Sequence, residues 1–230
     1  GVVRLQQEFG ADASTIGAIL TGVQRDLRTP SAIDQLTRQA AGGGIDWTLR
    51  FDRGSYELKG FTGFSHITGS ERAIERVQRG SAHYFQRPDA DHLTLDSTRT
   101  ALTGTTASLS LEKRGGRHWL WGFGASAESP EFEINDAGRL LAADDIDTYA
   151  HIIYRENIPG PMFHSYLFEF TASNGWNFGW TRQYTTFGLS FRNTWKNFWS
   201  SSIYMDYGLR ALSDNLTRGG PLMETGAGWN

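Results

Sequence analysis

Acidic and histidine side chains within one stretch of the chain offer the clearest potential for chemistry. Asp89, Asp91 and Asp96 lie close together in the sequence with His92. Spaced carboxylates of this kind can hold Ca²⁺, which prefers oxygen ligands. The stretch lacks the central glycine and the final glutamate of an EF-hand loop. A loop whose acids face solvent or pair with arginine is therefore the simpler interpretation.

Two further acidic stretches suggest comparable hypotheses. Residues 144–147 contain three aspartates, and Glu131, Glu133 and Asp136 could supply the two carboxylates of a glycosidase. Such an enzyme needs an acid and a base held across the sugar in a defined cleft. Nothing in the spacing of these residues fixes that geometry, so a structured surface loop is the simpler interpretation and no catalytic residue is assigned.

The histidines are spread along the chain. His83 and His92 share one loop, whereas His118, His151 and His164 lie on or beside different expected strands. No HExxH segment or comparable metal-binding spacing occurs, and the chain has no Cys to supply thiolate ligands or disulfides. The pattern indicates neither a metal nor another cofactor, and it does not indicate an enzyme.

A second group of charged residues alternates with apolar ones along several segments. Seven of them are candidates for lining a charged lumen: Arg50, Glu57, Lys59, Glu169, Arg192, Asp206 and Arg210. The planar guanidinium of arginine suits bidentate pairing with carboxylates. The set could form a surface that selects solutes, and it could equally be a set of structural ion pairs that fill the interior.

Alternation of apolar and polar residues is the pattern of half-buried β-strands and dominates the chain. The expected strands cover residues 2–9, 14–22, 44–51, 55–64, 100–113, 118–126, 147–155, 162–172, 183–193, 198–211 and a last one from about 221. One segment has helical spacing instead: Ser70 should cap a helix over residues 71–79, with Ala73, Ile74 and Val77 on one face.

The connections between these strands alternate between short and long. The short, turn-like ones are 10–13, 52–54, 114–117, 156–161 and 194–197, and the long ones are 23–43, 65–99, 127–146, 173–182 and 212–220. In an antiparallel meander, alternate connections lie at opposite ends of the sheet. Short turns at one end and long loops at the other are typical of outer-membrane barrels.

Alternation alone does not say which face of each strand points inward. A soluble sheet buries its apolar face, whereas a membrane barrel turns that face toward lipid. Several expected strands reach the ~9–11 residues that a tilted membrane strand needs, and Trp and Tyr cluster near strand ends, as in interfacial girdles. We therefore expect six apolar side chains to contact lipid: Phe168, Phe170, Leu189, Phe191, Met205 and Leu209.

Composition excludes several other classes of protein. The chain has 230 residues, 39% hydrophobic and 13% aromatic, so it is not disordered. Its 27 glycines have no period of three, which excludes collagen, and no apolar run approaches the length of a transmembrane helix. A net charge of −3 gives no electrostatic basis for binding nucleic acid.

Several segments resemble a known family. They are Ala82 to Leu93 with its Gln-Arg-Pro-Asp-Ala-Asp-His core, the Ser129 to Asp136 segment, and Gly44-Ile45-Asp46-Trp47 ahead of Ser55-Tyr56-Glu57-Leu58. Over roughly residues 40–215, the chain resembles a bacterial family of membrane-barrel domains. In that family the barrel follows an N-terminal domain similar to the family 9 carbohydrate-binding modules. The resemblance implies the cell outer membrane and a link to carbohydrate, and it supplies no catalytic residues.

Together these observations predict an all-β fold: an antiparallel, up-and-down transmembrane β-barrel of which about 10–11 strands are present. We expect residues 1–230 to be part of one such barrel domain, without the carbohydrate-binding-like domain. The expected partner is the lipid bilayer, with carbohydrate as a further candidate, and the role is that of a channel, a transporter or an anchor. The alternative is a soluble β-rich carbohydrate-binding or carbohydrate-active protein with Trp176 and Trp180 as sugar platforms.

The loop over residues 80–99 is the most distinctive segment of the sequence. Its chemistry-bearing residues are candidates for a site at the barrel mouth: His83, Arg87, Asp89, Asp91 and His92. Tyr84 and Phe85 are costly to leave in water, and Pro88 stiffens the chain beside them. We expect this loop to fold over the mouth with Arg87 paired to an acid, and to restrict passage.

Overall fold

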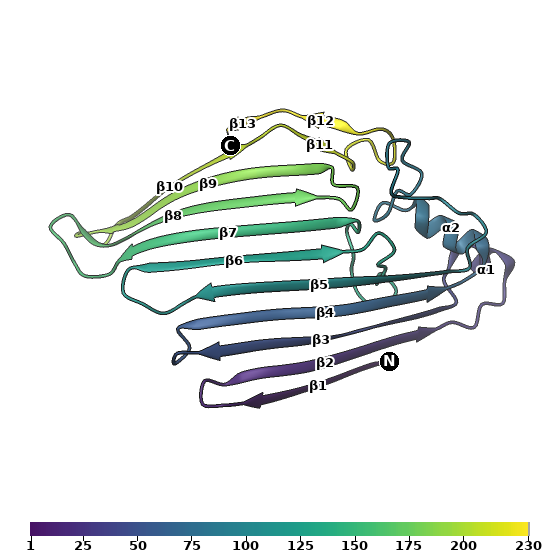
Figure 1. The fold of residues 1–230 in the computed structure, drawn as a ribbon, viewed down its shortest axis with the longest axis horizontal. Coiled ribbons are helices and arrows are strands. Elements are labelled where there is room, and N and C mark those ends of the chain that lie inside the picture. The colour runs from purple at the N-terminus through teal and green to yellow at the C-terminus, as the bar shows by residue number, and fades with distance from the viewer. Residues whose placement is uncertain (230) are drawn as a thin grey trace.

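A computed structural model describes residues 1–229 of the chain; Asn230, the end of the last expected strand, lies outside the described residues. An 11-stranded antiparallel sheet with neighbouring strands paired in sequence order forms most of the molecule (Figure 1). Its strands are β1 (Val2–Phe9), β2 (Ser14–Gln24), β3 (Gln39–Phe51), β4 (Tyr56–Thr68), β5 (Ala101–Lys113), β6 (Trp119–Glu128), β7 (Asp145–Glu156), β8 (Phe163–Trp176), β9 (Arg182–Trp195), β10 (Ser200–Gly208) and β13 (Gly228–Trp229). The prediction of an all-β, up-and-down meander is confirmed.

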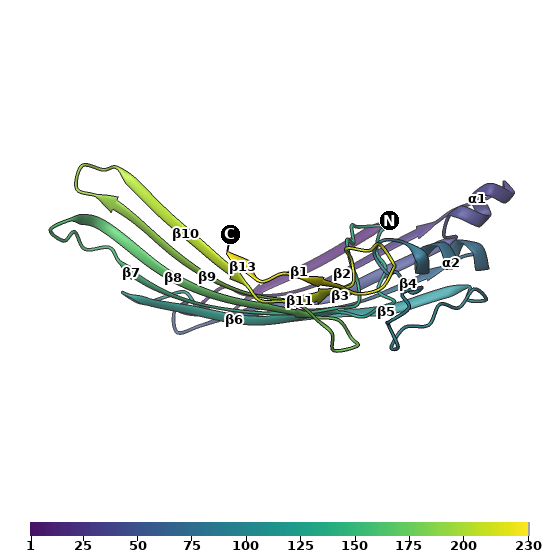
Figure 2. The ribbon, with the colours of Figure 1, turned by 90° about the horizontal axis from the view of Figure 1, so that it is seen from above.

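The sheet is an open, curved arc (Figure 2). The order begins at β1 and ends with β13 beside β10, and these two edges are not paired with each other within residues 1–229. A separate hairpin, β11 (Ala211–Ser213) with β12 (Met223–Thr225), follows β10. Closure into a barrel is therefore not seen in the part of the chain that the structure describes.

Several strands extend beyond the expected segments. β3 begins at Gln39, and its first residues continue the ladder to Thr68 of β4, although residues 39–44 are Gln, Ala and Gly without apolar alternation. At the other end of the chain the prediction was too long: β10 ends at Gly208, so Leu209 and Arg210 lie outside it. The expected last strand is replaced by the short β12 and β13.

The longest connections gather at one end of the sheet and the tight turns at the other (Figure 1). One expected long loop is wrong: β8 extends to Trp176 and β9 begins at Arg182, so only 177–181 connects them. The expected helix is α2 (Glu71–Arg79), whose N-cap Ser70 accepts a hydrogen bond from Ala73 N. A second helix that the sequence did not predict, α1 (Pro30–Gln35), is capped by Thr29 and buries no residue.

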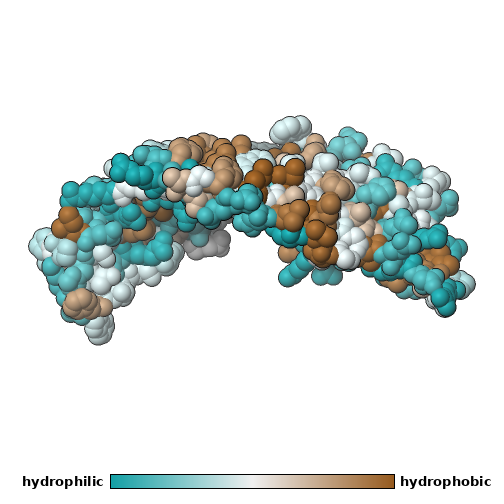
Figure 3. All heavy atoms as spheres, turned by 90° about the horizontal axis from the view of Figure 1, so that it is seen from below, coloured by the Kyte–Doolittle hydropathy of each residue, from teal (hydrophilic) through white to brown (hydrophobic). Residues whose placement is uncertain are grey.

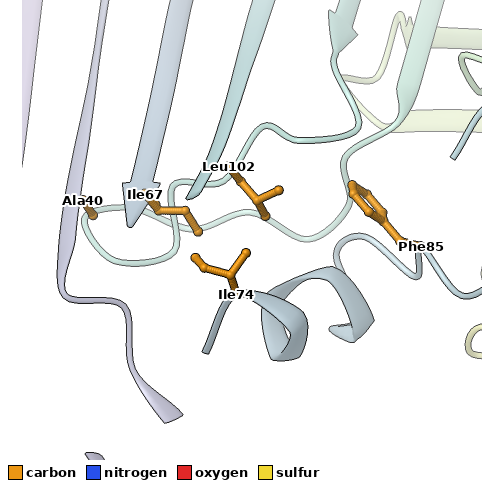
Figure 4. Close-up of a cluster of buried hydrophobic side chains, with 5 residues drawn as sticks. All are labelled: Ala40, Ile67, Ile74, Phe85 and Leu102. Carbon is orange, nitrogen blue, oxygen red and sulfur yellow. The ribbon is translucent and has the colours of Figure 1, made fainter. Parts of the chain in front are cut away.

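A small hydrophobic core lies under α2 at the loop end of the sheet (Figure 4). Its buried members come from β3, β4, β5, α2 and the following loop: Ala40, Ile67, Ile74, Phe85 and Leu102. Figure 2 places α2 on the concave side of the arc. Because α2 packs on Ile67 and Leu102, side chains in register with these two face the concave side.

The two faces of the sheet differ in chemistry. On the convex side, large apolar side chains are exposed on many strands, among them Leu5, Ile45, Leu109, Phe123, Ile152, Phe168, Leu189 and Ile203. Figure 3, which looks onto the edge of the arc, shows hydrophobic side chains gathered around its middle and mostly hydrophilic ones toward both ends. The concave side carries most of the charged residues of the strands. No helix of residues 1–229 is long and apolar enough to cross a membrane.

Candidate functional site

A carboxylate at the turn end of the concave face is surrounded by three cations. Glu57 of β4 accepts hydrogen bonds from Arg50 Nε at 2.9 Å and Arg114 Nη1 at 2.7 Å. Lys59 Nζ lies 2.9 Å from Glu57 Oε1, the oxygen that Arg114 also contacts, and only 2% of the Glu57 side chain is exposed. Three of the expected lumen residues are thus brought together, and the buried negative charge of Glu57 is contacted by three positive charges.

A second charged group lies farther along the concave face, on β8 to β10. Arg192 Nη2 donates to Glu169 Oε2 at 2.8 Å, and Ser190 Oγ donates to the same oxygen at 3.2 Å. Asp206 lies over Gly188, where a Cβ would come within 2.6 Å of Asp206 Oδ1. Glycine here leaves room for a carboxylate to lie flat on the sheet.

Arg210 is the exception among the expected lumen residues. It follows the end of β10 and is exposed, and its Nη1 donates to Glu224 Oε1 of β12 at 3.1 Å. The expectation that residues 198–211 form one strand placed it on the polar face of the sheet. The strand ends at Gly208 instead, so Arg210 belongs to the segment that leaves the sheet.

Two ion-pair groups on the concave face were not predicted. Arg4 of β1 reaches across β2 to Asp46 of β3, with Nη1 and Oδ1 2.5 Å apart. The path crosses Gly17, where a Cβ would lie 2.9 Å from Arg4 Nη2. Glu112 accepts a hydrogen bond from Tyr149 Oη at 3.1 Å and lies 3.3 Å from His151 Nε2. The sequence feature that could have indicated the Arg4–Asp46 pair is Gly17, a glycine on the polar face of the strand between them.

A buried ion-pair cluster joins the loops at the opposite end of the sheet, and we call its members Arg87, Asp144, Asp214 and His92 the loop latch. Arg87 donates through Nη2 to Asp144 Oδ2 at 2.5 Å, and its Nη1 lies 2.5 Å from Asp214 Oδ2. The side chains of Arg87 and Asp144 are 4% and 1% exposed. Arg87 is therefore paired to an acid, as predicted.

The latch has further partners in the same loop after α2 and in the β8–β9 turn. His92 Nε2 lies 2.9 Å from Asp144 Oδ2, and the backbone N–H of Phe178 donates to Asp144 Oδ1 at 3.0 Å. Asn177 Nδ2 donates to Asp214 Oδ2 at 3.2 Å. The loop after α2, the loop before β7, the β8–β9 turn and the segment after β11 thus meet at one point.

His83 forms a second buried contact between the loops. Its Nδ1 lies 2.8 Å from the carbonyl oxygen of Pro130, and its Nε2 lies 2.9 Å from Glu133 Oε2. Both ring nitrogens thus face oxygens of the loop before β7. The backbone N–H of Glu133 donates to Ser65 Oγ at 2.8 Å, which fixes the loop before β7 on the concave face.

The three acids considered as Ca²⁺ ligands lie in separate environments. Asp89 accepts a hydrogen bond from the backbone N–H of Leu222 at 2.5 Å, and Asp91 is exposed. Asp96 accepts from Thr98, whose hydroxyl and amide hold the pKa of Asp96 below its usual value. Within residues 1–229, no three His, Asp or Glu side chains gather in a manner suited to a metal ion.

The carboxylates considered for glycosidase chemistry are also engaged with other groups. Glu133 contacts His83, and Asp136 accepts from Thr37 and pairs with Arg25 Nη2 at 2.6 Å. Glu131 lies 3.7 Å from Arg99. These contacts hold the loop before β7 against its neighbours; Glu133 and Asp136 line one groove, but each carboxylate there is already engaged by a partner side chain.

A family model described as a domain of unknown function, DUF5916, matches residues 2–215. The chain belongs to the DUF5916 family. A search of curated proteins and a search of solved structures each found no match. The matched part of this DUF5916 chain contains all strands from β1 to β11 and every member of the loop latch.

A groove of about 670 Å³ lies between the loop before β7 and the concave face of the DUF5916 sheet. Phe61, Phe132 and Ile134 form part of its apolar lining, and Glu128 and Asp145 contribute carboxylates. Chemically, the concave side offers charged and hydroxyl groups that can bind a polar solute, and the loops of the latch lie at one end of it.

Proposed function

We propose that this DUF5916 chain forms part of the wall of an outer-membrane β-barrel. In this proposal the convex face contacts lipid, and the concave face lines a passage for polar solutes or an interior filled by ion pairs. One observation carries the proposal: exposed apolar side chains cover the convex face while the charged pairs occupy the concave face.

The physical reason is that apolar side chains on the outer face would be unfavourable if that face were in contact with water. A soluble sheet turns its apolar face toward a core and its polar face toward water. In β8 the apolar side chains of Phe168 and Phe170 are exposed on the convex, outer side of the arc. The charged side chain between them, Glu169, pairs with Arg192 on the concave, inner side. Exposed apolar surface of this extent marks an interaction with a membrane or a protein.

Strand length supports a membrane span. β8 and β9 have 14 residues each, whereas a tilted strand needs only about 9–11 residues to cross the hydrocarbon core. Exposed tryptophans lie near both ends: Trp119, Trp195 and Trp199 beside the tight turns, and Trp180 beside the loops. Aromatic side chains at the two levels of the membrane interface are a feature of such barrels.

The loop end supports a restricting role. In outer-membrane barrels the long loops are extracellular and the short turns are periplasmic. The latch and the His83 contact bring the loop after α2, the loop before β7 and the segment after β11 together at the loop end of the sheet. We therefore assign the protein a role as a channel, a transporter or an anchor, with carbohydrate as the candidate class of solute.

Phase partition of the full-length protein tests the proposal. Cells expressing it are fractionated, and the membrane fraction is extracted with a detergent that separates into two phases on warming. The protein should enter the detergent phase, and the purified protein should insert into lipid vesicles. Recovery in buffer without detergent would contradict the proposal and favour a soluble carbohydrate-binding protein that uses exposed aromatics such as Trp180.

A further inference from the structure

An apolar groove of about 390 Å³ crosses β7 to β10 on the convex face. Its lining is formed mainly by Ile152, Phe168, Leu189, Ile203 and Met205. Phe168 stacks on Phe191 with ring centroids 4.5 Å apart, which gives one wall a rigid aromatic surface. A flat lipid-facing surface would carry no such hollow, so this part of the face has a shape that can hold an extended hydrocarbon chain.

The groove continues toward the tight turns through a row of aromatic rings. The rings of Tyr154 and Tyr166 are 6.2 Å apart, and those of Tyr166 and Phe168 are 5.9 Å apart. Tyr166 and Phe163 line a second hollow of about 370 Å³ beside the β7–β8 turn, and Arg117 forms part of the same hollow. The apolar channel therefore ends at a cationic side chain.

Further positive charge lies at the neighbouring β5–β6 turn, which also carries Arg117. The side chain of Lys113, on the convex face of β5, lies within contact distance of a Cβ placed at Gly116. One acid, Glu156, also lines the hollow, but it accepts a hydrogen bond from Ile158 N and lies 3.5 Å from His118 Nδ1. The two cationic side chains Arg117 and Lys113 thus outnumber one carboxylate that has its own partners.

We propose that this groove binds one anionic phospholipid, with an acyl chain along Leu189 and Phe168 and the phosphate beside Arg117. The inference rests on the proposed membrane function and names a lipid partner for that face. Charge complementarity selects the occupant, because an apolar channel that ends at clustered Arg and Lys matches a lipid with an anionic headgroup. Basic side chains at the membrane surface attract anionic lipids, and aromatic rings favour the interfacial level.

Native mass spectrometry of the full-length protein in detergent tests the proposal. The protein is titrated with phosphatidylglycerol or with phosphatidylcholine of the same acyl chains, and bound lipid is counted. We expect one phosphatidylglycerol to bind at least about fivefold more tightly than phosphatidylcholine, the factor that one basic residue near a membrane surface supplies. Arg117→Gln should remove most of this preference, and Ile152→Trp, which fills the groove, should weaken the binding of both lipids.

Two matched variants complete the design. Arg53→Gln removes an exposed cation from another tight turn, and Leu109→Trp adds the same bulk to the convex face of β5 outside the groove. Both should bind lipid as the parent does. Equal affinity for the two lipids, or equal effects of Arg117→Gln and Arg53→Gln, would overturn the proposal while detergent-phase partition and vesicle insertion still supported a membrane barrel. Failure to enter the detergent phase would instead overturn the proposed function itself.

Discussion

Arg87 and Asp144 form an ion pair from which water is almost excluded, although one residue follows α2 and the other immediately precedes β7. Withdrawing two charges from water is costly, and the pair is tolerated because Asp214, His92 and the N–H of Phe178 supply further partners. The pair therefore acts as a latch between loops that share no backbone ladder.

Arg87→Gln should release this latch. Removing one partner of a buried ion pair costs about 3–5 kcal/mol because the other charge stays buried and unpaired. We expect amide hydrogen exchange in residues 129–144 to accelerate strongly, while the central sheet keeps its protection.

Arg79→Gln is the matched control for this change. Arg79 forms an exposed pair with Glu75 within α2, and such pairs contribute only about 0.3–0.5 kcal/mol. If the two variants exchanged at the same rate in residues 129–144, Arg87 would not hold the loops together.

Gly104→Ala should displace the same loop for a steric reason. A Cβ at Gly104 of β5 would overlap the backbone of Phe132, which lies directly on the sheet. The loop before β7 should become sensitive to protease. Gly22→Ala is the control, because its Cβ would meet only Ala40 O, at 4.0 Å; cleavage at equal rates would show that the loop does not rest on β5.

Phe168→Arg should be more damaging than Ser190→Arg. Near the bilayer midplane, an arginine that faces lipid costs about 2–4 kcal/mol, and Phe168 lies on the convex face. Ser190 lies on the concave face beside Glu169, which can pair with a new arginine. Urea-dependent unfolding in lipid vesicles measures both costs, and a larger loss for Ser190→Arg would invert the assignment of the faces.

The tight turns should face the periplasm. The chain contains no Cys, so Lys196→Cys in the exposed β9–β10 turn and Asp91→Cys in the long loop after α2 each add one thiol to it. A membrane-impermeant maleimide applied to intact cells should label the Asp91 position and leave the Lys196 position unlabelled until the outer membrane is permeabilised. Labelling in the opposite order would contradict this topology.

Local patterns accounted for most of the fold. Alternation placed β1 correctly at both ends, and Ser70 with the following apolar spacing placed α2 correctly. The patterns were insufficient where packing on neighbouring strands decides the structure. Residues 39–43 lack alternation because small residues there lie beneath loops. Asn174 and Gly175, expected within the long connection 173–182, instead continue β8 through a ladder to β9.

The candidate site was predictable only in part, because ion pairing over long separations leaves no mark in local spacing. The Arg87 loop was identified as distinctive and an acidic partner was expected. The partners Asp144 and Asp214, however, come from segments far along the chain. Arg210 was placed wrongly because the alternation continues past Gly208, where the strand ends. Asp46 lies on the polar face, but its partner Arg4 reaches it only because Gly17 has no side chain.

Site-directed spin labelling at two adjacent residues tests the central claim, the orientation of the two faces, most directly. Leu189→Cys and Ser190→Cys place labels on opposite faces of β9 in the protein reconstituted into vesicles. Power saturation then compares collision with oxygen, which concentrates in lipid, against collision with a water-soluble nickel complex. We predict that the label at position 189 is relaxed more by oxygen and the label at position 190 more by nickel. The reverse pattern, or equal access of the nickel complex to both positions, would contradict the account.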